Sequence, residues 1–241
     1  MSGTTSRFLR KLIVFNRLAC YLAAALLIVS CVSTVRAQWT GGVEGGTVVQ
    51  DAGNATRLRL VLRNNEKPLS HYLFAEWLRS VADENSYSVG YNPRYWFSAK
   101  YYLFGESEFG TDDIFSIEQE VTLVTGVGGQ FINSESQGLY AEAGVGGRSI
   151  EFDDDDSANT EALGVVRAGY YRTIAETVKL DVNVNGSRSD ADVSRASSEV
   201  GLALRISGGS VRIAYRNRYI RVDDADSITD DDTYISYGYS F

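Results

Sequence analysis

Hydrophobic and polar side chains alternate along most of this chain, from about residue 38 to its C-terminus. The last eight residues, YISYGYSF, show the pattern clearly: large apolar side chains occupy positions 235, 237, 239 and 241, with small residues between them. A period of two is the repeat of a β-strand, whose successive side chains point to opposite faces. The segment therefore predicts a strand with one large apolar face and one small, polar face.

The same alternation defines twelve segments. Their approximate cores are residues 38–49, 55–63, 70–80, 86–97, 100–109, 115–131, 138–150, 161–173, 177–187, 196–206, 210–222 and 233–241. In the second segment, Leu58, Leu60 and Leu62 share one face, opposite Arg57 and Arg59. Most segments have about the 9–11 residues that a tilted strand needs to cross a bilayer. None holds an apolar run long enough for a membrane-spanning helix.

A sheet in water would also alternate, so the prediction of a membrane protein rests on three further features. These are an N-terminal export signal, a terminal Phe241 on the apolar face, and the even number of segments. A bilayer can solvate the apolar faces if the sheet closes on itself, because closure leaves no unpaired strand edge. We therefore predict one all-β domain over residues 38–241. It is a single up-and-down antiparallel transmembrane β-barrel of about twelve strands, located in the cell outer membrane.

Residues 1–37 have the features of a cleaved signal peptide. Basic residues precede the apolar run at 18–29, and Val-Arg-Ala at 35–37 offers a small-x-small cleavage pattern. A lipoprotein signal is the alternative, because residues 28–31, Ile-Val-Ser-Cys, resemble a lipobox. Both cysteines, Cys20 and Cys31, lie in this segment, so its removal would leave no thiol for a disulfide or a metal site.

Composition and charge agree with a β-rich exported protein. The chain has 23 glycines, 15 tyrosines and only 2 prolines, a composition that favours strands over helices. Five of its 23 Lys and Arg residues, and none of its 31 acids, lie in residues 1–37, so the mature chain has 18 basic residues and a net charge of −13. That charge excludes a nucleic-acid partner.

The aspartates segregate into alternate connections between the segments. Sixteen of the seventeen fall in one set of connections, at positions 51, 83, 112–113, 153–156, 190, 192 and 223–232, and the other is Asp181, within a strand. The remaining connections, near residues 64–68, 98–100, 133–136, 173–176 and 207–210, contain none. We predict that the acidic set faces outside and the other set faces the periplasm, since outer-membrane barrels have longer outer loops and short periplasmic turns.

Three stretches carry a family resemblance. They are WTGG at 39–42 with Gly-Asn at 53–54, YYLFGESEFGTDD at 101–113 with VTGVGG at 124–129, and LYAEAGVGGR at 139–148. Together they resemble the salt-induced outer-membrane protein family, whose barrel-type domain has no assigned function. The resemblance covers most of residues 38–241. It implies a barrel and a compartment, but no activity and no catalytic residues.

The residues of the chain offer little for catalysis. The one histidine, His71, adjoins Ser70, but neighbouring residues of a strand point to opposite faces and cannot form a base–nucleophile pair. Gly126, Gly128 and Gly129 lie inside a strand with no helix after them, so we interpret them as relief of crowding inside the barrel rather than a phosphate-binding loop. We predict no enzyme and no cofactor.

Charged residues on the inward faces are predicted to line the lumen. They are Arg57, Arg59, Arg63, Glu106, Glu108, Glu118, Glu120, Glu142, Arg205, Arg212, Arg216 and Arg218. Closing the barrel places the basic segments in one arc that faces an acidic arc on the fifth to seventh segments, with Glu44, Glu199 and Arg148 as exceptions. Two interpretations are open: a lumen plugged by paired charges, or a narrow polar pore with opposed charged walls.

The aspartate clusters also allow two interpretations. Asp153, Asp154, Asp155, Asp156, Asp223, Asp224 and Asp226 could be simply solvated or could hold Ca²⁺ or Mg²⁺ weakly and collectively, because carboxylate oxygens suit these ions. None has the spacing of a dedicated calcium loop. The expected partners are outer-membrane lipid and lipopolysaccharide, divalent cations, and the export and barrel-assembly machinery, the last through the strand ending at Phe241.

We therefore predict a non-catalytic outer-membrane barrel with acidic surface loops and a structural or narrow solute- or ion-conducting role. The alternatives are an outer-membrane lipid-modifying enzyme and a surface-exposed binding module.

Overall fold

The computed structural model describes residues 39–50, 53–79, 85–113, 116–152, 159–191, 193–222 and 227–241. The predicted signal peptide, residues 1–37, lies outside these ranges. So do the predicted metal ligands Asp153 to Asp156, Asp223, Asp224 and Asp226. In the described part of the chain, no helix has the length and apolar character needed to span a membrane.

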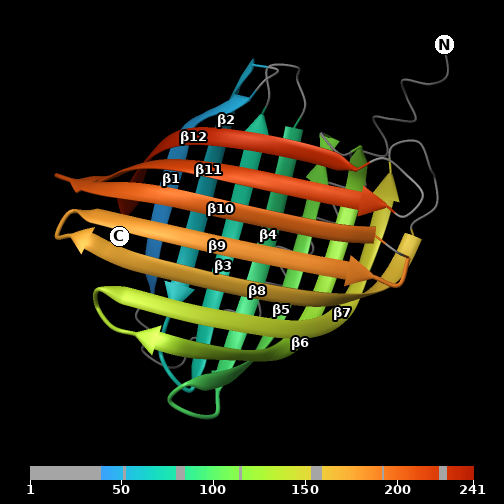
Figure 1. Cartoon of the computed structure of the whole chain (residues 1–241), viewed down its shortest axis with the longest axis horizontal. Coiled ribbons are helices and arrows are strands. Elements are labelled where there is room, and N and C mark those ends of the chain that lie inside the picture. Colours follow the sequence, from blue (N-terminus) through green and yellow to red (C-terminus); the bar gives the residue numbers. More distant parts are fainter. Residues whose placement is uncertain are drawn as a thin grey trace. The chain divides into compact units, whose positions relative to one another are not determined.

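Twelve strands make up the fold (Figure 1). They are β1 (Thr40–Gln50), β2 (Gly53–Asn64), β3 (Leu69–Arg79), β4 (Asn85–Trp96), β5 (Tyr101–Asp112), β6 (Ile117–Asn133), β7 (Gln137–Phe152), β8 (Asn159–Ala175), β9 (Val178–Ser189), β10 (Val193–Ile206), β11 (Gly209–Val222) and β12 (Ile228–Ser240). Each strand pairs antiparallel with its neighbours in sequence, and β1 pairs with β12 to close the barrel. The predicted all-β, up-and-down barrel of twelve strands is confirmed.

The seam between the first and last strands is fully bonded. The Gly41 amide donates to the Phe241 carbonyl at 2.8 Å, and the Phe241 amide donates back to the Gly41 carbonyl at 2.9 Å. The pairing then continues from Gly42 opposite Ser240 to Val49 opposite Thr233. Closure leaves no free strand edge, which is the condition for apolar strand faces to lie against lipid.

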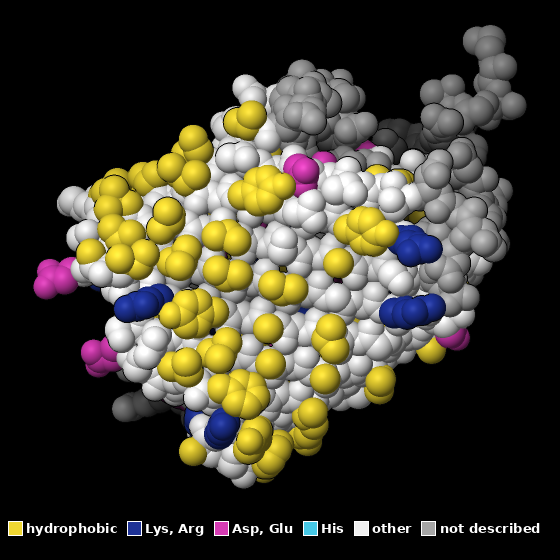
Figure 2. Space-filling model, viewed as in Figure 1, with side chains coloured by type: hydrophobic (Ala, Val, Ile, Leu, Met, Phe, Trp, Pro, Cys, Tyr) yellow, Lys and Arg dark blue, Asp and Glu magenta, His cyan; other side chains and the backbone are white. Residues whose placement is uncertain are grey.

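The outward faces are apolar, as the alternation predicts. Tyr237 and Tyr239 on β12 and Phe241 directly after it have exposed fractions of 49%, 55% and 60%. Leu58 and Leu60 on β2 are also exposed. Figure 2 shows apolar side chains spread over the outer wall of the barrel, with few charged side chains among them. The inward residues of the same strands, such as Tyr234 at 1%, are buried.

The strands of the barrel meet at two ends. At the turn end, residues 65–68, 97–100, 134–136, 176–177 and 207–208 connect the strands. At the loop end, the connections are residues 51–52, 80–84, 113–116, 153–158, 190–192 and 223–227. The short connections that lack aspartate lie together at the turn end. The two sets of alternate connections predicted from the sequence therefore lie at opposite ends of the barrel.

Four aspartates that the sequence places in loops belong to strands. Asp112 ends β5, and Asp230, Asp231 and Asp232 lie in β12, which begins at Ile228 instead of residue 233. Apolar alternation fails there because the outward residues of β12, Thr229 and Asp231, are as polar as the inward ones. The prediction for these residues was wrong, and their inward members are ion-pair partners in the lumen.

Glycines make room for rings inside the barrel. A Cβ on Gly128 would lie 2.4 Å from the ring of Tyr102, and one on Gly126 would lie 2.7 Å from Phe104 and 2.2 Å from the Ala143 carbonyl oxygen. Real Cβ atoms do not approach this closely, so the two glycines are needed for Tyr102 and Phe104 to lie flat across β6. This confirms the interpretation of crowding at these two positions. Gly129 faces the other way, and a Cβ added to it would lie 3.1 Å from the ring of Tyr101.

Candidate functional site

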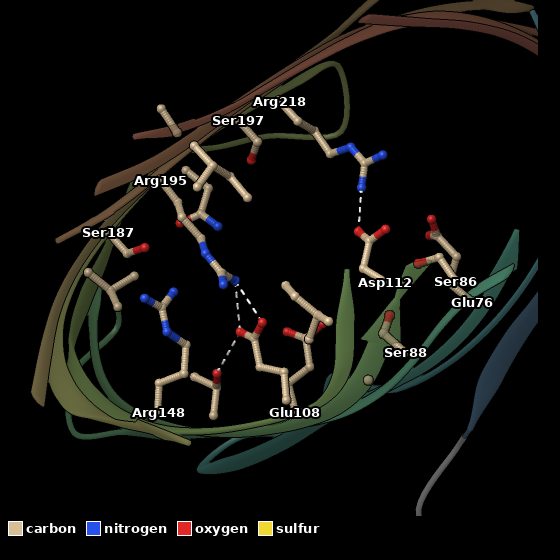
Figure 3. Close-up of a pocket in the computed structure, with 18 of the residues that line it drawn as sticks. Glu76, Ser86, Ser88, Glu108, Asp112, Arg148, Ser187, Arg195, Ser197 and Arg218 are labelled. Atoms are coloured by element: carbon tan, nitrogen blue, oxygen red, sulfur yellow. Dashed lines mark hydrogen bonds and ion pairs between the residues drawn. The ribbon is translucent and has the colours of Figure 1, made fainter. Parts of the chain in front are cut away.

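A cavity of about 320 Å³ lies inside the loop-end half of the barrel, lined by residues from β3 to β11. Each strand turns every second side chain inward, and the lining combines carboxylates, guanidinium groups and hydroxyls with apolar side chains such as Ile117 and Val165. Figure 3 shows these side chains converging from opposite walls. The cavity and the charged residues around it form the candidate functional site.

Ion pairs join opposite walls across this cavity. Arg218 Nη1 on β11 lies 2.8 Å from Asp112 Oδ2 on β5, six places away around the ring of twelve strands. Arg195 on β10 reaches Glu120 on β6 at 2.7 Å. Both contacts are drawn as dashed lines in Figure 3. These arginine side chains therefore extend through the part of the lumen that water would fill in an open pore.

The middle of the lumen is filled by a second group of contacts. Arg167 Nη2 donates to Glu106 Oε1 at 2.5 Å, and Arg94 Nη2 lies 2.9 Å from Glu142 Oε1. The Tyr102 hydroxyl also donates to Glu142, at 2.8 Å. Tyr102 and Phe104 are almost fully buried, and they pack with Val124, Leu163 and Val165. Aromatic rings and ion pairs together occupy the barrel at this level.

Acids and bases interleave on β9 to β12 as well. Arg212 Nη2 on β11 lies 2.5 Å from Asp181 and 2.7 Å from Glu199. Arg216 on the same strand pairs with the fully buried Asp232 at 2.7 Å and reaches Glu76 at 3.4 Å. The predicted basic arc therefore carries its own carboxylates, which neutralise it locally.

The basic strand β2 completes this network. Arg57 Nη2 donates to Glu76 at 2.7 Å, and its guanidinium lies 4.3 Å from the centre of the Tyr234 ring. Arg59 is 3.7 Å from the same carboxylate. Glu76 therefore holds arginines from β2 and β11 together, which further closes the lumen.

The structure places most of the predicted lumen residues inward, but not all at the cavity. Those lining the cavity are Glu106, Glu108, Glu120, Arg216 and Arg218. Arg57, Arg59, Glu142 and Arg212 take part in the inner pairs described above. Glu118 does not line the cavity, because the register of β6 against β7 shifts between Ile117 and Gln119 and breaks the alternation.

Several charged residues of the lumen were missing from the predicted set. They are Arg94, Asp112, Glu161, Arg167, Asp181, Arg195, Asp230 and Asp232. A strict count of every second residue along β4, β8 and β10 would have found Arg94, Arg167 and Arg195. Asp112, Asp230 and Asp232 were hidden by the misplaced strand ends.

The turn-end mouth of the lumen is basic. Arg63 on β2, Lys179 on β9 and Arg205 on β10 lie there, and all three are exposed. Within the described part of the chain they form no ion pair, although Lys179 Nζ lies 4.2 Å from the centre of the Tyr171 ring and Arg63 lies over Tyr72. These three basic side chains therefore have no direct ion-pair partner among the described residues.

His71 and Ser70 do not form a catalytic pair. Ser70 Oγ accepts a hydrogen bond from Trp96 Nε1 at 3.1 Å on the inner face. His71 Nδ1 lies 2.8 Å from the Tyr91 hydroxyl, and its ring stacks between Trp39 and Tyr91. The histidine belongs to an aromatic group near the turn end. Within the described ranges, no three or more His, Cys, Asp or Glu residues are grouped so that they could hold a metal ion.

Comparisons with known proteins agree with this architecture. A family model described as "Protein of unknown function, DUF481" matches residues 55–241. The uncharacterized protein YdiY of Escherichia coli K12 is 26% identical over 166 residues, which cover 67% of this chain and 65% of that protein.

Solved structures share the fold. The NanC porin has a TM-score of 0.56 at 9% identity, covering 83% of this chain and 98% of its own. An outer-membrane channel from Pseudomonas putida F1 has a TM-score of 0.52 at 9% identity, covering 87% and 97%. The translocator domain of the autotransporter NalP from Neisseria meningitidis also has 0.52, at 12% identity, covering 95% and 98%. At these identities the likeness extends to the fold alone.

Proposed function

The chain belongs to the DUF481 family of proteins of unknown function, and we propose that it is an integral outer-membrane barrel whose lumen is closed by ion pairs. In this proposal it catalyses no reaction. Its role is structural, or it conducts small ions only when the lumen pairs separate. The observation that carries the proposal is the set of ion pairs that join opposite walls, above all Arg218 with Asp112.

The outer surface supports residence in a membrane. Large apolar side chains are exposed around the barrel, on β2, β10 and β12 among others. In water such a surface would be costly, whereas lipid tails solvate it. The export signal predicted at residues 1–37 and the acidic connections at the loop end favour the outer membrane, with the loop end outside. Lipid and lipopolysaccharide would then surround the barrel, and the strand ending at Phe241 would meet the assembly machinery.

The lumen contacts favour closure over an open pore. The pairs cross the barrel from β11 to β5, from β10 to β6 and from β8 to β5. Each pair satisfies charges that a water-filled pore would leave hydrated. Below the cavity, Tyr102 and Phe104 fill the space between the walls.

The test is single-channel recording of the refolded protein in a planar bilayer, together with swelling of liposomes in small sugars. We expect no steady open-channel current at physiological salt and no sugar uptake. Correct insertion is checked by the resistance of the folded barrel to protease. A stable, large conductance from correctly inserted protein would refute closure, and soluble, lipid-free native protein would refute membrane residence.

A further inference from the structure

The cavity at the loop end contains one carboxylate without a cation. The five acids in its lining are Glu76, Glu106, Glu108, Asp112 and Glu120. Every one of them except Glu108 lies within 2.8 Å of an arginine nitrogen. Glu108 forms no hydrogen bond or ion pair with any residue that the structure describes. Among the described residues, Glu108 is therefore the one acid of the lining that no arginine holds.

The position of Glu108 makes the lack of a partner for its carboxylate energetically costly. On β5 it lies between Gly90 of β4 and Thr122 of β6, and Figure 3 shows its side chain inside the barrel. Glu106 and Glu120 line the same cavity. A carboxylate that is partly removed from water and close to two others is stabilised by a nearby cation. The arginines of the cavity already hold other acids, so either a proton or a cationic ligand must neutralise Glu108.

Part of the remaining lining offers hydroxyl groups. Ser88, Ser187 and Ser197 line the cavity from β4, β9 and β10, and Figure 3 shows them around the space that Glu108 enters. Their side chains make no hydrogen bond to another residue in the described part of the chain. Hydroxyls can donate and accept, so they suit a ligand that carries hydroxyls of its own.

These observations favour an organic cation over a divalent metal ion as the ligand of the cavity. A divalent ion would need several oxygen ligands at once, but the other four acids are held by arginines, and no metal-binding group of acids occurs in the described ranges. We propose that the cavity binds a small protonated amine bearing hydroxyl groups, of the amino-sugar class, with its ammonium group at Glu108 and its hydroxyls at the serines. The cavity volume of about 320 Å³ falls at the lower end of small-molecule sites, which span about 300–1,000 Å³.

Glucosamine is the probe, and glucose is its uncharged counterpart. Titration calorimetry of the folded barrel in detergent, at constant ionic strength, should detect binding of glucosamine and at least tenfold weaker binding of glucose. Glu108→Gln keeps the shape and removes the charge, so it should weaken glucosamine binding by about tenfold or more. Glu118→Gln is the matched control, because that acid does not line the cavity, and it should leave the affinity unchanged.

Three results would overturn the proposal. One is equal binding of glucose and glucosamine, which would make the site a neutral sugar site. Another is displacement of glucosamine by equimolar Na⁺ or Mg²⁺, which would make it an inorganic cation site. The third is unchanged affinity in folded Glu108→Gln. If that variant does not fold, the comparison of the two sugars on the unmodified protein decides alone. Binding is measured without conductance, so its failure would leave closure of the lumen untouched.

Discussion

Replacing Arg218 with glutamine should open a leak at a small cost in stability, whereas replacing Arg148 should cost more stability and open none. Both arginines lie in the lumen beside the cavity. Arg218 reaches Asp112 on the opposite wall, but Arg148 pairs with Glu161 on the neighbouring strand β8. Only the first pair crosses the lumen, so only its loss should let ions pass.

The stability effects follow from burial. The side chains of Arg148 and Glu161 are 3% and 5% exposed, and breaking a buried ion pair by removing one partner costs about 3–5 kcal/mol. Arg218 and the two acids that it holds, Asp112 and Asp230, are 17%, 18% and 17% exposed. Because water in the cavity can reach them, the expected cost there is about 1–2 kcal/mol, between the values for buried and for surface pairs.

The two quantities are measured on the same preparations. Urea unfolding in lipid vesicles, followed by tryptophan fluorescence, gives the free energy of unfolding, and planar-bilayer recording gives the conductance. The expected order is reversed between the assays: Arg148→Gln is the less stable variant and Arg218→Gln the more conductive one. The reasoning is refuted if the less stable variant, Arg148→Gln, is also the more conductive one. In that case a general loosening of the barrel opens it, and the transverse pairs do not keep it closed.

Four further outcomes are expected. A tag inserted at Asp154 should be labelled by a membrane-impermeant reagent in intact cells, whereas a tag at Glu135 should not; the opposite pattern would invert the topology. In the Arg218→Gln background, replacing Arg63, Lys179 and Arg205 with glutamine should shift the reversal potential toward cation selectivity, and no shift would mean that the turn-end mouth does not select. Millimolar Ca²⁺ should raise the unfolding temperature more than Na⁺ at matched ionic strength, and asparagine at 153–156 should abolish the difference; equal effects of both ions would leave only screening. Gly128→Val should destabilise the barrel by about 1–3 kcal/mol through its clash with Tyr102, whereas Gly129→Val should change little, and equal losses would contradict the packing argument.

The fold could be predicted from the sequence because the barrel imposes one rule on every strand. Each outward residue faces the same kind of surroundings, so the apolar repeat of two recurs from β1 to β12 and fixes the number of strands. The rule fails where a strand is polar on both faces, as in β12 around Asp231. There the repeat of apolar residues disappears although the strand continues, so strand ends were the least accurate part of the prediction.

The partners inside the lumen could not be predicted in the same way. Alternation gives the face of a residue but not its height along the barrel axis, which depends on the stagger between strands. Alternation also does not show how far across the lumen a side chain extends. Arg195 contacts Glu120 four strands away, whereas Arg148 contacts Glu161 on the adjacent strand. Two opposed arcs of charge were therefore predicted where the structure has local neutralisation, with Asp181, Glu199 and Asp232 among the arginines.

Among the described residues, the charged side chains that have no ion-pair partner are distributed unevenly along the barrel axis. The turn-end mouth retains the positive charges of Arg63, Lys179 and Arg205. The cavity toward the loop end contains Glu108, which no arginine in the described ranges holds, and the aspartates at 153–156 belong to the connections at the same end. An anion is thus attracted at one end and repelled at the other, and a cation the reverse, because fields in a narrow, low-dielectric lumen are weakly screened. When the transverse pairs separate, these end charges slow the flow of either ion without stopping it, and the acidic loop end favours cations. Closure of the lumen therefore rests on the charges that are paired across it, and the proposed cation binding rests on the carboxyl group that is not.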